Sequence, residues 1–368
     1  MKYSVFTSES VCAGHPDKIC DQISDSVVDA AISIYPKSRV ACETLVTTNK
    51  IVLAGEVTCP KSIDFEKLAR NKVEELGYLE DKFEFNNKAS IEVYIHQQSP
   101  DIALGVDDGG AGDQGMMFGY ACNETKQFMP LPITIAHELC QKMDTLHSKY
   151  VWLRPDGKSE VAVNYENGKV KSIKNIVLAK PFDYSKIDNT EVKKVLFDEV
   201  ISPVLEKYKM NLIPIDEFVF NGTGKWEIGG PASDTGVTGR KIVVDTYGGM
   251  ARIGGGCFSG KDTTKVDRSA AYAARYIAKN IVAAGLADRC EVQLAYVIGC
   301  VEPIVRAIET FDTANKALSV IEDFAWNLLD LSVDGINQGL DLRQAIYQKT
   351  ARYGHFGNES YPWEKIKG

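Results

Sequence analysis

Residues 254–269 carry the strongest chemical signal of the chain, because they combine glycines with paired charges just ahead of a helix-like segment. Three consecutive glycines let a backbone approach a ligand closely. Lys261 and Lys265 bring positive charge, while Asp262 and Asp267 can hold a metal or favour the start of a helix. The run nearly matches the phosphate-binding pattern G-x-x-x-x-G-K-[ST], but Asp262 stands where Ser or Thr should bind magnesium. We therefore expect a polyphosphate ligand in a fold other than the P-loop fold.

A second charged motif lies in residues 7–18, where His15, Asp17 and Lys18 come at the start of a predicted helix. Free N–H groups and the helix dipole favour anions at such a position. The alternative is that Asp17 only favours the helix start and His15 is a surface residue. Glu9 and Lys18 in the same motif favour a binding site.

A glycine-dense loop at residues 229–241 ends in two adjacent basic side chains, Arg240 and Lys241. Flexible backbone beside Asp234 and this basic pair suits a phosphate or an amino-acid head group. The apolar, β-branched residues 242–244 predict a strand directly after the loop.

Two other glycine-containing segments each allow two interpretations. Residues 99–115 are rich in glycine and aspartate, which is typical both of a mobile lid over an active site and of a plain interdomain linker. Residues 154–158 contain Pro-Asp-Gly, which by itself favours a turn over a binding site.

Composition narrows the class of protein. The chain has 368 residues, which favours two or three domains, and its hydrophobic and charged fractions of 44% and 25% are typical of a soluble globular protein. No apolar run approaches a membrane span, and the N-terminus has no apolar signal core. The net charge of −8 argues against a general nucleic-acid binder. Nine cysteines without C-x-x-C or zinc-like spacing indicate reduced thiols, so we expect a cytoplasmic protein.

The apolar periodicity predicts a repeated order of elements. It indicates helices at 17–34, 64–76, 131–148, 190–207, 268–284 and 315–329, and strands at 39–47, 51–58, 91–95, 160–165, 170–178, 218–220, 292–298 and 304–308. Helix, strand, strand, helix, strand therefore recurs three times without residue-level identity. We expect an α+β fold of three similar modules, each a layer of helices on a mixed sheet, with boundaries at 1–104, 105–225 and 226–368.

Three of these motifs together resemble the S-adenosylmethionine synthetase (methionine adenosyltransferase) family. They are Gly-His-Pro-Asp-Lys at 14–18, Gly-Ala-Gly-Asp-Gln-Gly at 110–115 and Gly-Gly-Gly-Cys-Phe-Ser-Gly-Lys-Asp at 254–262. The likeness runs from Phe6-Thr-Ser-Glu-Ser10 to Tyr353-Gly-His-Phe-Gly357, which is nearly the whole chain. Motifs of this length are specific.

The resemblance implies both an architecture and a reaction. Its fold has three related modules around a pseudo-threefold axis, and its active sites lie between two subunits, usually in a dimer of dimers. In its reaction, methionine sulfur attacks C5′ of ATP, and the released triphosphate is hydrolysed to pyrophosphate and phosphate. Two Mg²⁺ per site and K⁺ are the implied cofactors. The alternatives are an ATP-dependent kinase or ligase using the same polyphosphate site, and a nucleotide-binding regulator without catalysis.

Matching motif positions assigns roles to individual residues. The catalytic set is His15, Lys158, Arg240, Lys261 and Lys265. The ATP-binding set is His15, Asp156, Gly157, Lys158, Lys225, Trp226, Asp234, Arg240, Lys241, Cys257, Lys261 and Lys265. The methionine-binding set is Glu56, Gln98, Asp113, Asp234 and Lys265. The implied metal ligands are Glu9, Asp17 and Asp267 for Mg²⁺ and Glu43 for K⁺.

The chain departs from the family pattern at four places. Cys12-Ala13 stands where Ser-Glu is common, and residues 99–113 are shorter than in many bacterial members. Lys225-Trp226 replaces a common Arg-Phe, and lysine lacks the bidentate fork of arginine, so contacts to adenine or phosphate should change. Cys257 replaces a usual alanine, and we expect it to make the site sensitive to thiol reagents.

Overall fold

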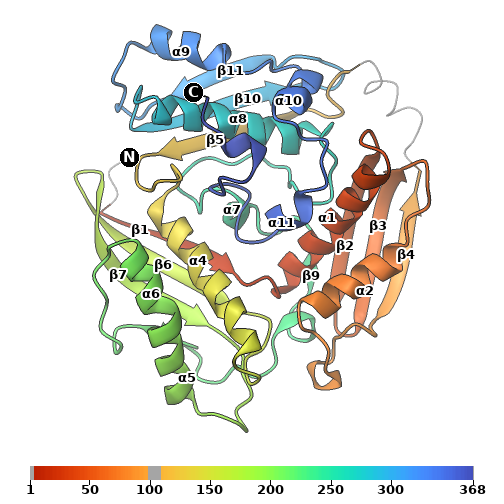
Figure 1. The fold of residues 1–368 in the computed structure, drawn as a ribbon, viewed down its shortest axis with the longest axis vertical. Helices are drawn as coiled ribbons and strands as arrows, with labels where there is room; N and C mark the ends of the chain where they lie inside the picture. Colours follow the sequence, from red (N-terminus) through yellow and green to blue (C-terminus); the bar gives the residue numbers. More distant parts are fainter. Residues whose placement is uncertain (1–3, 98–108, 368) are drawn as a thin grey trace.

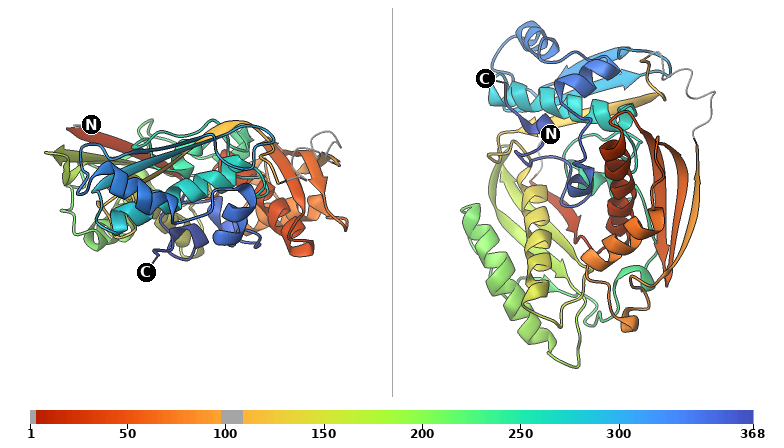
Figure 2. Two further views of the ribbon diagram at one scale, coloured as in Figure 1. Left: turned by 90° about the horizontal axis from the view of Figure 1, so that it is seen from above. Right: turned by 45° about the vertical axis from the view of Figure 1, so that its right-hand side comes forward.

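Three β-sheets, each with helices packed on one face, surround a common centre in the computed structural model of the chain (Figure 1). The structure describes residues 4–97 and 109–367. The helices and the C-terminal segment gather on one side of the sheets (Figure 2, left). The expected α+β fold of three sheet-and-helix layers is confirmed.

Each sheet takes strands from distant parts of the chain. The first sheet has the order β4-β3-β2-β9, formed by β2 (Arg39–Thr47), β3 (Lys50–Thr58), β4 (Ser90–His96) and β9 (Gly236–Val237). The second has the order β1-β6-β7-β8, formed by β1 (Val5–Val11), β6 (Lys158–Glu166), β7 (Lys169–Ala179) and β8 (Val219–Phe220). The third has the order β11-β10-β5, formed by β5 (Gly115–Cys122), β10 (Arg289–Tyr296) and β11 (Val305–Glu309).

The first two sheets are mixed, because β3 pairs with β4 and β7 with β8 in parallel, whereas the third is antiparallel. Strands β1, β5 and β9 were not expected from the sequence. They tie the sheets to segments far away along the chain, so the sheets interleave. The module boundaries at 104/105 and 225/226 therefore stay a prediction.

The six predicted helices are present, and the helices at 242–245, 333–339 and 347–350 were not expected from the sequence. The helices are α1 (Pro16–Ile34), α2 (Phe65–Glu75), α4 (Leu131–Thr145), α5 (Asn189–Leu196), α6 (Ser202–Lys207), α7 (Ile242–Asp245), α8 (Val266–Ala283), α9 (Leu318–Trp326), α10 (Val333–Gly339) and α11 (Tyr347–Thr350). A π-helical turn joins α5 to α6 inside the predicted 190–207 helix. Helices α1 and α8 are almost wholly buried, and their N-termini carry the charged motifs.

The strand predicted at 242–244 is wrong, because these residues form the single helical turn α7. The N–H of Asp245 donates to the carbonyl of Lys241 at 2.8 Å. A helical turn brings residues four apart together, whereas a strand would separate them by roughly 13 Å. This turn lets both Lys241 and Asp245 reach α1, where they pair with Asp17 and Lys18. Their pairing across elements overrides the β-branched local preference.

Candidate active site

The N-terminus of α1 holds His15 as a neutral imidazole. His15 is the N-cap residue, and its Nδ1 accepts a hydrogen bond from the backbone N–H of Asp17 at 3.2 Å. Burial, together with the positive charges of Lys241 and Lys158, lowers the pKa of His15 to about 3. Because Nδ1 accepts, the proton of the neutral ring is on Nε2, which can donate to an anion.

Asp17 connects α1 to the basic loop that precedes α7. Its carboxylate accepts the N–H of Val237 at 2.9 Å and lies 2.6 Å from Lys241 Nζ. Burial opposes the charged form, yet the hydrogen bonds from Lys241 and Val237 lower the pKa of Asp17 overall. Arg240 Nε approaches the same carboxylate at 3.9 Å while half of its side chain stays exposed. The structure therefore brings the motifs at 14–18 and 229–241 into one site.

Lys18 is buried behind these residues and pairs with two aspartates, so it does not face a ligand. Its ammonium lies 2.8 Å from Asp21 and 2.5 Å from Asp245. Asp21 also accepts the N–H of Gly239 at 2.8 Å, so the Lys18–Asp21 pair fixes the loop that carries the basic residues. Burial raises the pKa of Asp245 to about 7, partly offset by Lys18.

The glycine-rich loop at 254–265 is anchored to α1 and β2. Gly260 has φ +81, and a Cβ there would lie 2.0 Å from the carbonyl oxygen of Cys42, so only glycine fits. Its N–H donates to Asp25 at 2.9 Å. Asp25 in turn accepts two hydrogen bonds from Arg268 on α8, at 2.8 and 2.7 Å, with both side chains fully buried. This pair fixes the loop against α1.

Two lysines of the loop are paired with aspartates. Lys261 Nζ lies 2.5 Å from Asp267 in the first turn of α8, and Lys265 Nζ lies 2.5 Å from Asp262. Asp262 is buried and also accepts the N–H of Val40 at 2.7 Å. The aspartate that breaks the P-loop pattern therefore holds the loop in place, while each lysine keeps about a fifth of its side chain exposed.

Residues 154–158 pack directly against the first motif. The N–H of Cys12 donates to the carbonyl of Gly157 at 2.9 Å. Asp156 is buried and accepts the N–H groups of Gly157 and Gly230 at 2.7 and 2.8 Å, and burial raises its pKa to about 6. Lys158 follows at the start of β6 with an exposed side chain. The segment thus connects the first motif to the 229–241 loop, which a plain turn would not require.

The expected adenine-side residues lie at the edge of this region. Trp226 is half-buried, and its backbone N–H donates to the hydroxyl of Tyr184 at 3.0 Å. Lys225 is exposed, 3.0 Å from Glu227 and 5.1 Å from the centre of the Tyr184 ring. Asp234 is exposed as well. The N–H of Asp234 donates to the carbonyl of Gly230 within the 229–241 loop at 3.2 Å.

Cys257 lies against Gly239, where a Cβ would come within 2.5 Å of the Cys257 Cβ. This contact joins the loop at 254–265 to the basic loop at 229–241. Burial raises the pKa of the Cys257 thiol to about 11. The thiol is therefore protonated near neutral pH, which slows its reaction with thiol reagents.

The expected ligands of potassium and of methionine include three exposed carboxylates. Glu43 of β2 and Glu56 of β3 are exposed, and Asp113 is exposed just before β5. Gln98 lies outside the described residues, as does most of the 99–113 stretch. The structure therefore does not gather these side chains into an enclosed pocket within its described parts.

The three expected magnesium ligands also stay apart. Within residues 4–97 and 109–367, no group of three or more His, Cys, Asp and Glu side chains could hold a metal alone. Asp17 and Asp267 each face a lysine, while Glu9 lies directly opposite Glu160 across β1 and β6. Mg²⁺ commonly uses one or two carboxylates together with substrate phosphates and water. This donor set fits such a shared ion, and it does not fit a protein-only cage.

Several supporting residues were missed from the sequence. Asp21, Asp25, Asp245 and Arg268 are buried charges that lie behind the ligand-facing residues. Tyr78 is an uncharged supporting residue that was also missed: its hydroxyl donates to the carbonyl of Gly14 at 2.6 Å, and its ring packs on Gly230. The charge pattern of each helix could have marked the aspartates, but nothing local predicts their partners.

Comparisons with known proteins define the class. Three family models match consecutive parts of the chain: the N-terminal domain of S-adenosylmethionine synthetase at residues 3–100, its central domain at 108–226 and its C-terminal domain at 228–365. The chain belongs to the S-adenosylmethionine synthetase family. A curated S-adenosylmethionine synthase from Mesoplasma florum is 48% identical over 371 residues, covering 98% of this chain and 97% of that relative.

The activity follows from this membership: the chain is an enzyme with methionine adenosyltransferase activity, which uses ATP and methionine. The expected transferase function is confirmed, and the kinase, ligase and regulator alternatives are not favoured. Enzymes of this class require a divalent metal. Within the described parts of the chain, no helix combines the length and apolar character needed to cross a membrane.

Proposed function

We propose that the neutral His15 and the cations of the paired loops form a cradle for the triphosphate of ATP, which leaves as a unit when methionine sulfur attacks C5′. A thioether carries no proton, so the attack needs no general base. Negative charge grows on the leaving triphosphate, and preorganised cations and N–H donors stabilise such charge. The observations that support this proposal are the Lys241–Asp17 pair beside His15 at the N-terminus of α1, the Lys261–Asp267 and Lys265–Asp262 pairs at the N-terminus of α8, and the contact of the two loops at Gly239 and Cys257.

His15 acts as a hydrogen-bond donor to the oxygen that departs from C5′. Its Nδ1 is occupied by the N–H of Asp17, which directs the Nε2 proton toward the ligand side. Lys158, Arg240, Lys241, Lys261 and Lys265 then hold the phosphate oxygens. Because its pKa is about 3, the ring is neutral near pH 7 and donates through Nε2 without taking up a second proton.

The remaining assignments concern the nucleoside and the amino acid. Asp156, Gly157, Lys225, Trp226 and Cys257 line the nucleoside side. The ammonium of methionine is held by Glu56, Gln98, Asp113 and Asp234, and its carboxylate by Lys265. Carboxylates suit an ammonium ion, and a lysine suits a carboxylate.

Two Mg²⁺ ions would be held by Asp17, Asp267 and Glu9 together with the phosphates, and K⁺ by Glu43. When bound, Mg²⁺ neutralises charge on the triphosphate. Support for a cation near β1 comes from Glu9 and Glu160, since like charges opposite each other in a sheet are destabilising without a counter-ion.

We further propose that two chains associate through their sheet faces as a dimer, with dimers pairing into a homotetramer, so that each active site is shared. Glu9, Glu43, Glu56 and Lys158 all lie on exposed strand positions, where a second subunit would enclose them. Apolar side chains are also exposed on strands: the side chain of Met116, opposite Ala295 in the third sheet, is 52% exposed. We place the enzyme in the cytoplasm, consistent with its nine free cysteines.

The experiment that tests this proposal is product identification. The protein is incubated with ATP, methionine, Mg²⁺ and K⁺, and the products are separated by chromatography. We expect S-adenosylmethionine with pyrophosphate and phosphate, because the triphosphate is hydrolysed before release. Free triphosphate as the final product would contradict the hydrolysis step, and ADP or AMP would contradict attack at C5′.

A further inference from the structure

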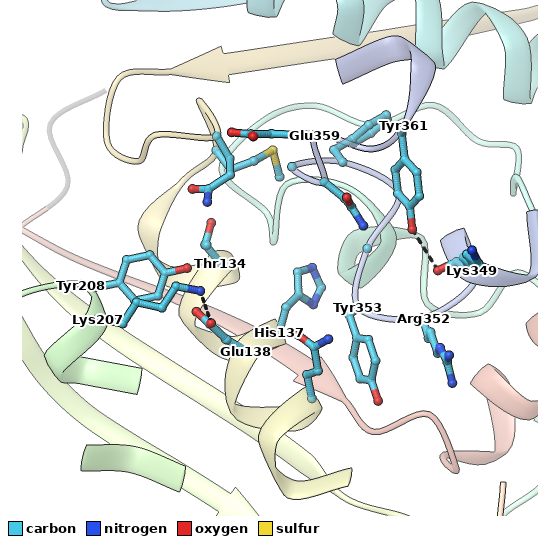
Figure 3. A pocket seen from close by; sticks show the side chains of 17 residues that line it. Thr134, His137, Glu138, Lys207, Tyr208, Lys349, Arg352, Tyr353, Glu359 and Tyr361 are labelled. Atoms are coloured by element: carbon cyan, nitrogen blue, oxygen red, sulfur yellow. Dashed lines mark hydrogen bonds and ion pairs between the residues drawn. The ribbon is translucent and has the colours of Figure 1, made fainter. Parts of the chain in front are cut away.

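A cavity of about 530 Å³ lies beside helix α4 (Figure 3). Helix α4 supplies one wall, and the segment at 349–361 after α11 supplies the facing wall. The end of α6 closes it at Lys207 and Tyr208. A volume of this size suits a small metabolite, and none of the residues assigned above to ATP, methionine or metal lines the cavity.

Two buried polar atoms at this cavity have no hydrogen-bond partner. They are Nε2 of His137 and Oε2 of Glu138, neighbours on α4. His137 is only 8% exposed, and burial lowers its pKa to about 3, so the ring is neutral. Buried polar atoms are nearly always hydrogen-bonded, and an unpartnered one costs about 1–3 kcal/mol. Both atoms therefore call for a polar guest.

The backbone of Gly354 lies close against the buried Nε2 of His137. Gly354 has φ +85, and a Cβ there would lie 2.6 Å from the His137 Nε2. Tyr353 before it has φ +58, in the left-handed region, which is unusual for a bulky residue. Such strain is commonly found at ligand clamps.

Three cations (Lys207, Lys349 and Arg352) and two carboxylates (Glu138 and Glu359) line the cavity, which suits an anion that also carries hydrogen-bond donors. Lys349 and Arg352 project from the C-terminal wall; Lys349 has no ion-pair partner in the described structure, and Arg352 has only a 3.8 Å contact with Glu75. Lys207 is already neutralised by Glu138, whose second oxygen stays free to accept a hydrogen bond. A phosphate or carboxylate would meet Lys349 and Arg352, while hydroxyl groups would reach Glu138.

Two cavity residues are hydrogen-bonded to the segment that carries His15. His137 Nδ1 lies 2.8 Å from the hydroxyl of Ser10, at the end of β1. Tyr353 donates its hydroxyl to Asp144 at 2.7 Å, and the same carboxylate oxygen accepts the N–H of Ala13 at 2.8 Å. A guest that contacts His137 and Tyr353 therefore acts on both ends of the stretch leading to His15.

We propose that this cavity is a second ligand site, which binds a small hydroxylated anion of the sugar-phosphate or hydroxycarboxylate class and adjusts adenosyl transfer through the segment at 10–15. Binding of the anion to this cavity does not depend on the proposed function, whereas its effect on turnover does. Failure of either can be recognised separately, because binding is measured without ATP or methionine.

The binding test titrates the full-length protein with glucose 6-phosphate and with citrate by calorimetry. We expect at least one probe to bind, and the double variant Lys349→Gln/Arg352→Gln to bind it at least tenfold more weakly. The matched control is Lys171→Gln/Arg306→Gln, an exposed lysine and arginine outside the cavity, which should bind as the wild type does. Lys261→Met should also leave probe binding intact.

Three outcomes would overturn the binding proposal. The first is that neither probe binds at about 5 mM, which exceeds the Kd of even a weak metabolite site. The second is unchanged binding in the Lys349/Arg352 variant. The third is loss of binding in Lys261→Met, which would locate the probe in the phosphate cradle.

The coupling is tested with Tyr353→Phe, which keeps the ring and removes the hydroxyl. A saturating probe should change the kcat of the wild type at least twofold, and this change should disappear in Tyr353→Phe while probe affinity stays within twofold. An unchanged kcat in the wild type, or an undiminished effect in Tyr353→Phe, would contradict the coupling through Asp144.

Discussion

The ammonium of Lys241 lies 2.6 Å from the carboxylate of Asp17, so a lysine expected to hold phosphate already has an acidic partner. Lys261 with Asp267 and Lys265 with Asp262 repeat this relationship at 2.5 Å. Asp17 and Asp267 are also the expected magnesium ligands. If these assignments hold, binding of Mg²⁺-ATP would be a partner exchange, in which the phosphates would pair with the lysines and the carboxylates of Asp17 and Asp267 would hold the metal.

Replacing Lys261 with methionine should lower kcat by roughly 10²–10³, the loss typical of removing one preorganised donor to developing charge. The melting temperature should stay close to that of the wild type. Lys261 and Asp267 each keep about a fifth of the side chain exposed, so water can reach Asp267 once its partner is removed. Lys171→Met serves as the control for a distant exposed lysine. Near-normal turnover in Lys261→Met would remove this residue from the cradle.

The Arg268→Leu variant should lose about 3–5 kcal/mol of unfolding free energy, because it leaves Asp25 charged and unpaired in the interior. Urea unfolding followed by circular dichroism measures this loss. Arg306→Leu breaks an exposed pair with Glu302 and should change stability by less than about 0.5 kcal/mol. Equal effects of the two substitutions would contradict the anchoring role of the Asp25–Arg268 pair.

Acidification should weaken the fold through His15. Its pKa is about 3 in the folded protein and 6.5 ordinarily, so the unfolded chain takes up the proton first. The stability contributed by the neutral ring is fully present above pH 6.5 and is lost progressively as the pH falls toward 3. The slope is at most about 1.4 kcal/mol per pH unit.

His15→Asn removes this proton uptake and keeps a side-chain donor. The variant should therefore lose less stability than the wild type between pH 6.5 and 4.5, as measured by melting temperature. The wild type must be compared with this variant because Asp156 also titrates between pH 6.5 and 4.5. Its pKa is raised to about 6, so its contribution to the free energy of unfolding increases as the pH falls, opposite to that of His15. Parallel pH curves for the two proteins would show that His15 is not the titrating group.

Cys257 should react slowly with iodoacetamide at pH 7.5 and faster as the pH rises toward 11, because its pKa is raised by burial. Mass spectrometry of the labelled peptide follows the rate. Cys257→Ala should retain near-normal turnover, since a half-buried, protonated thiol acts as a small apolar group. Rapid labelling at neutral pH would restore the sequence-based expectation of a thiol-sensitive site.

The sequence predicted most of the helices and long strands because their apolar spacing is local and strong. Helix α1 carries Ile19, Ile23 and Val27 on its buried face, which is visible without a structure. Strand β1 was missed because its inward residues, Ser8 and Ser10, are polar and are satisfied by hydrogen bonds to Gly248 and His137.

The ligand-facing residues could be predicted from motifs, but the residues that position them could not. Asp25 meets Arg268 across 243 positions, and Lys18 meets Asp245 across 227. Such pairs depend on how β1, β5 and β9 interleave the sheets, and this topology has no local signature. The helical turn at 242–245 was misread for the same reason.

The most direct test of the partner exchange is the affinity of a non-hydrolysable ATP analogue with and without Mg²⁺, measured by calorimetry for the wild type and for Asp17→Asn. In the wild type, Mg²⁺ should strengthen binding at least tenfold. Asp17→Asn frees Lys241, so metal-free binding should become stronger than in the wild type and the enhancement by Mg²⁺ should shrink. Metal-free binding that is no stronger in Asp17→Asn, with an undiminished Mg²⁺ effect, would contradict the account.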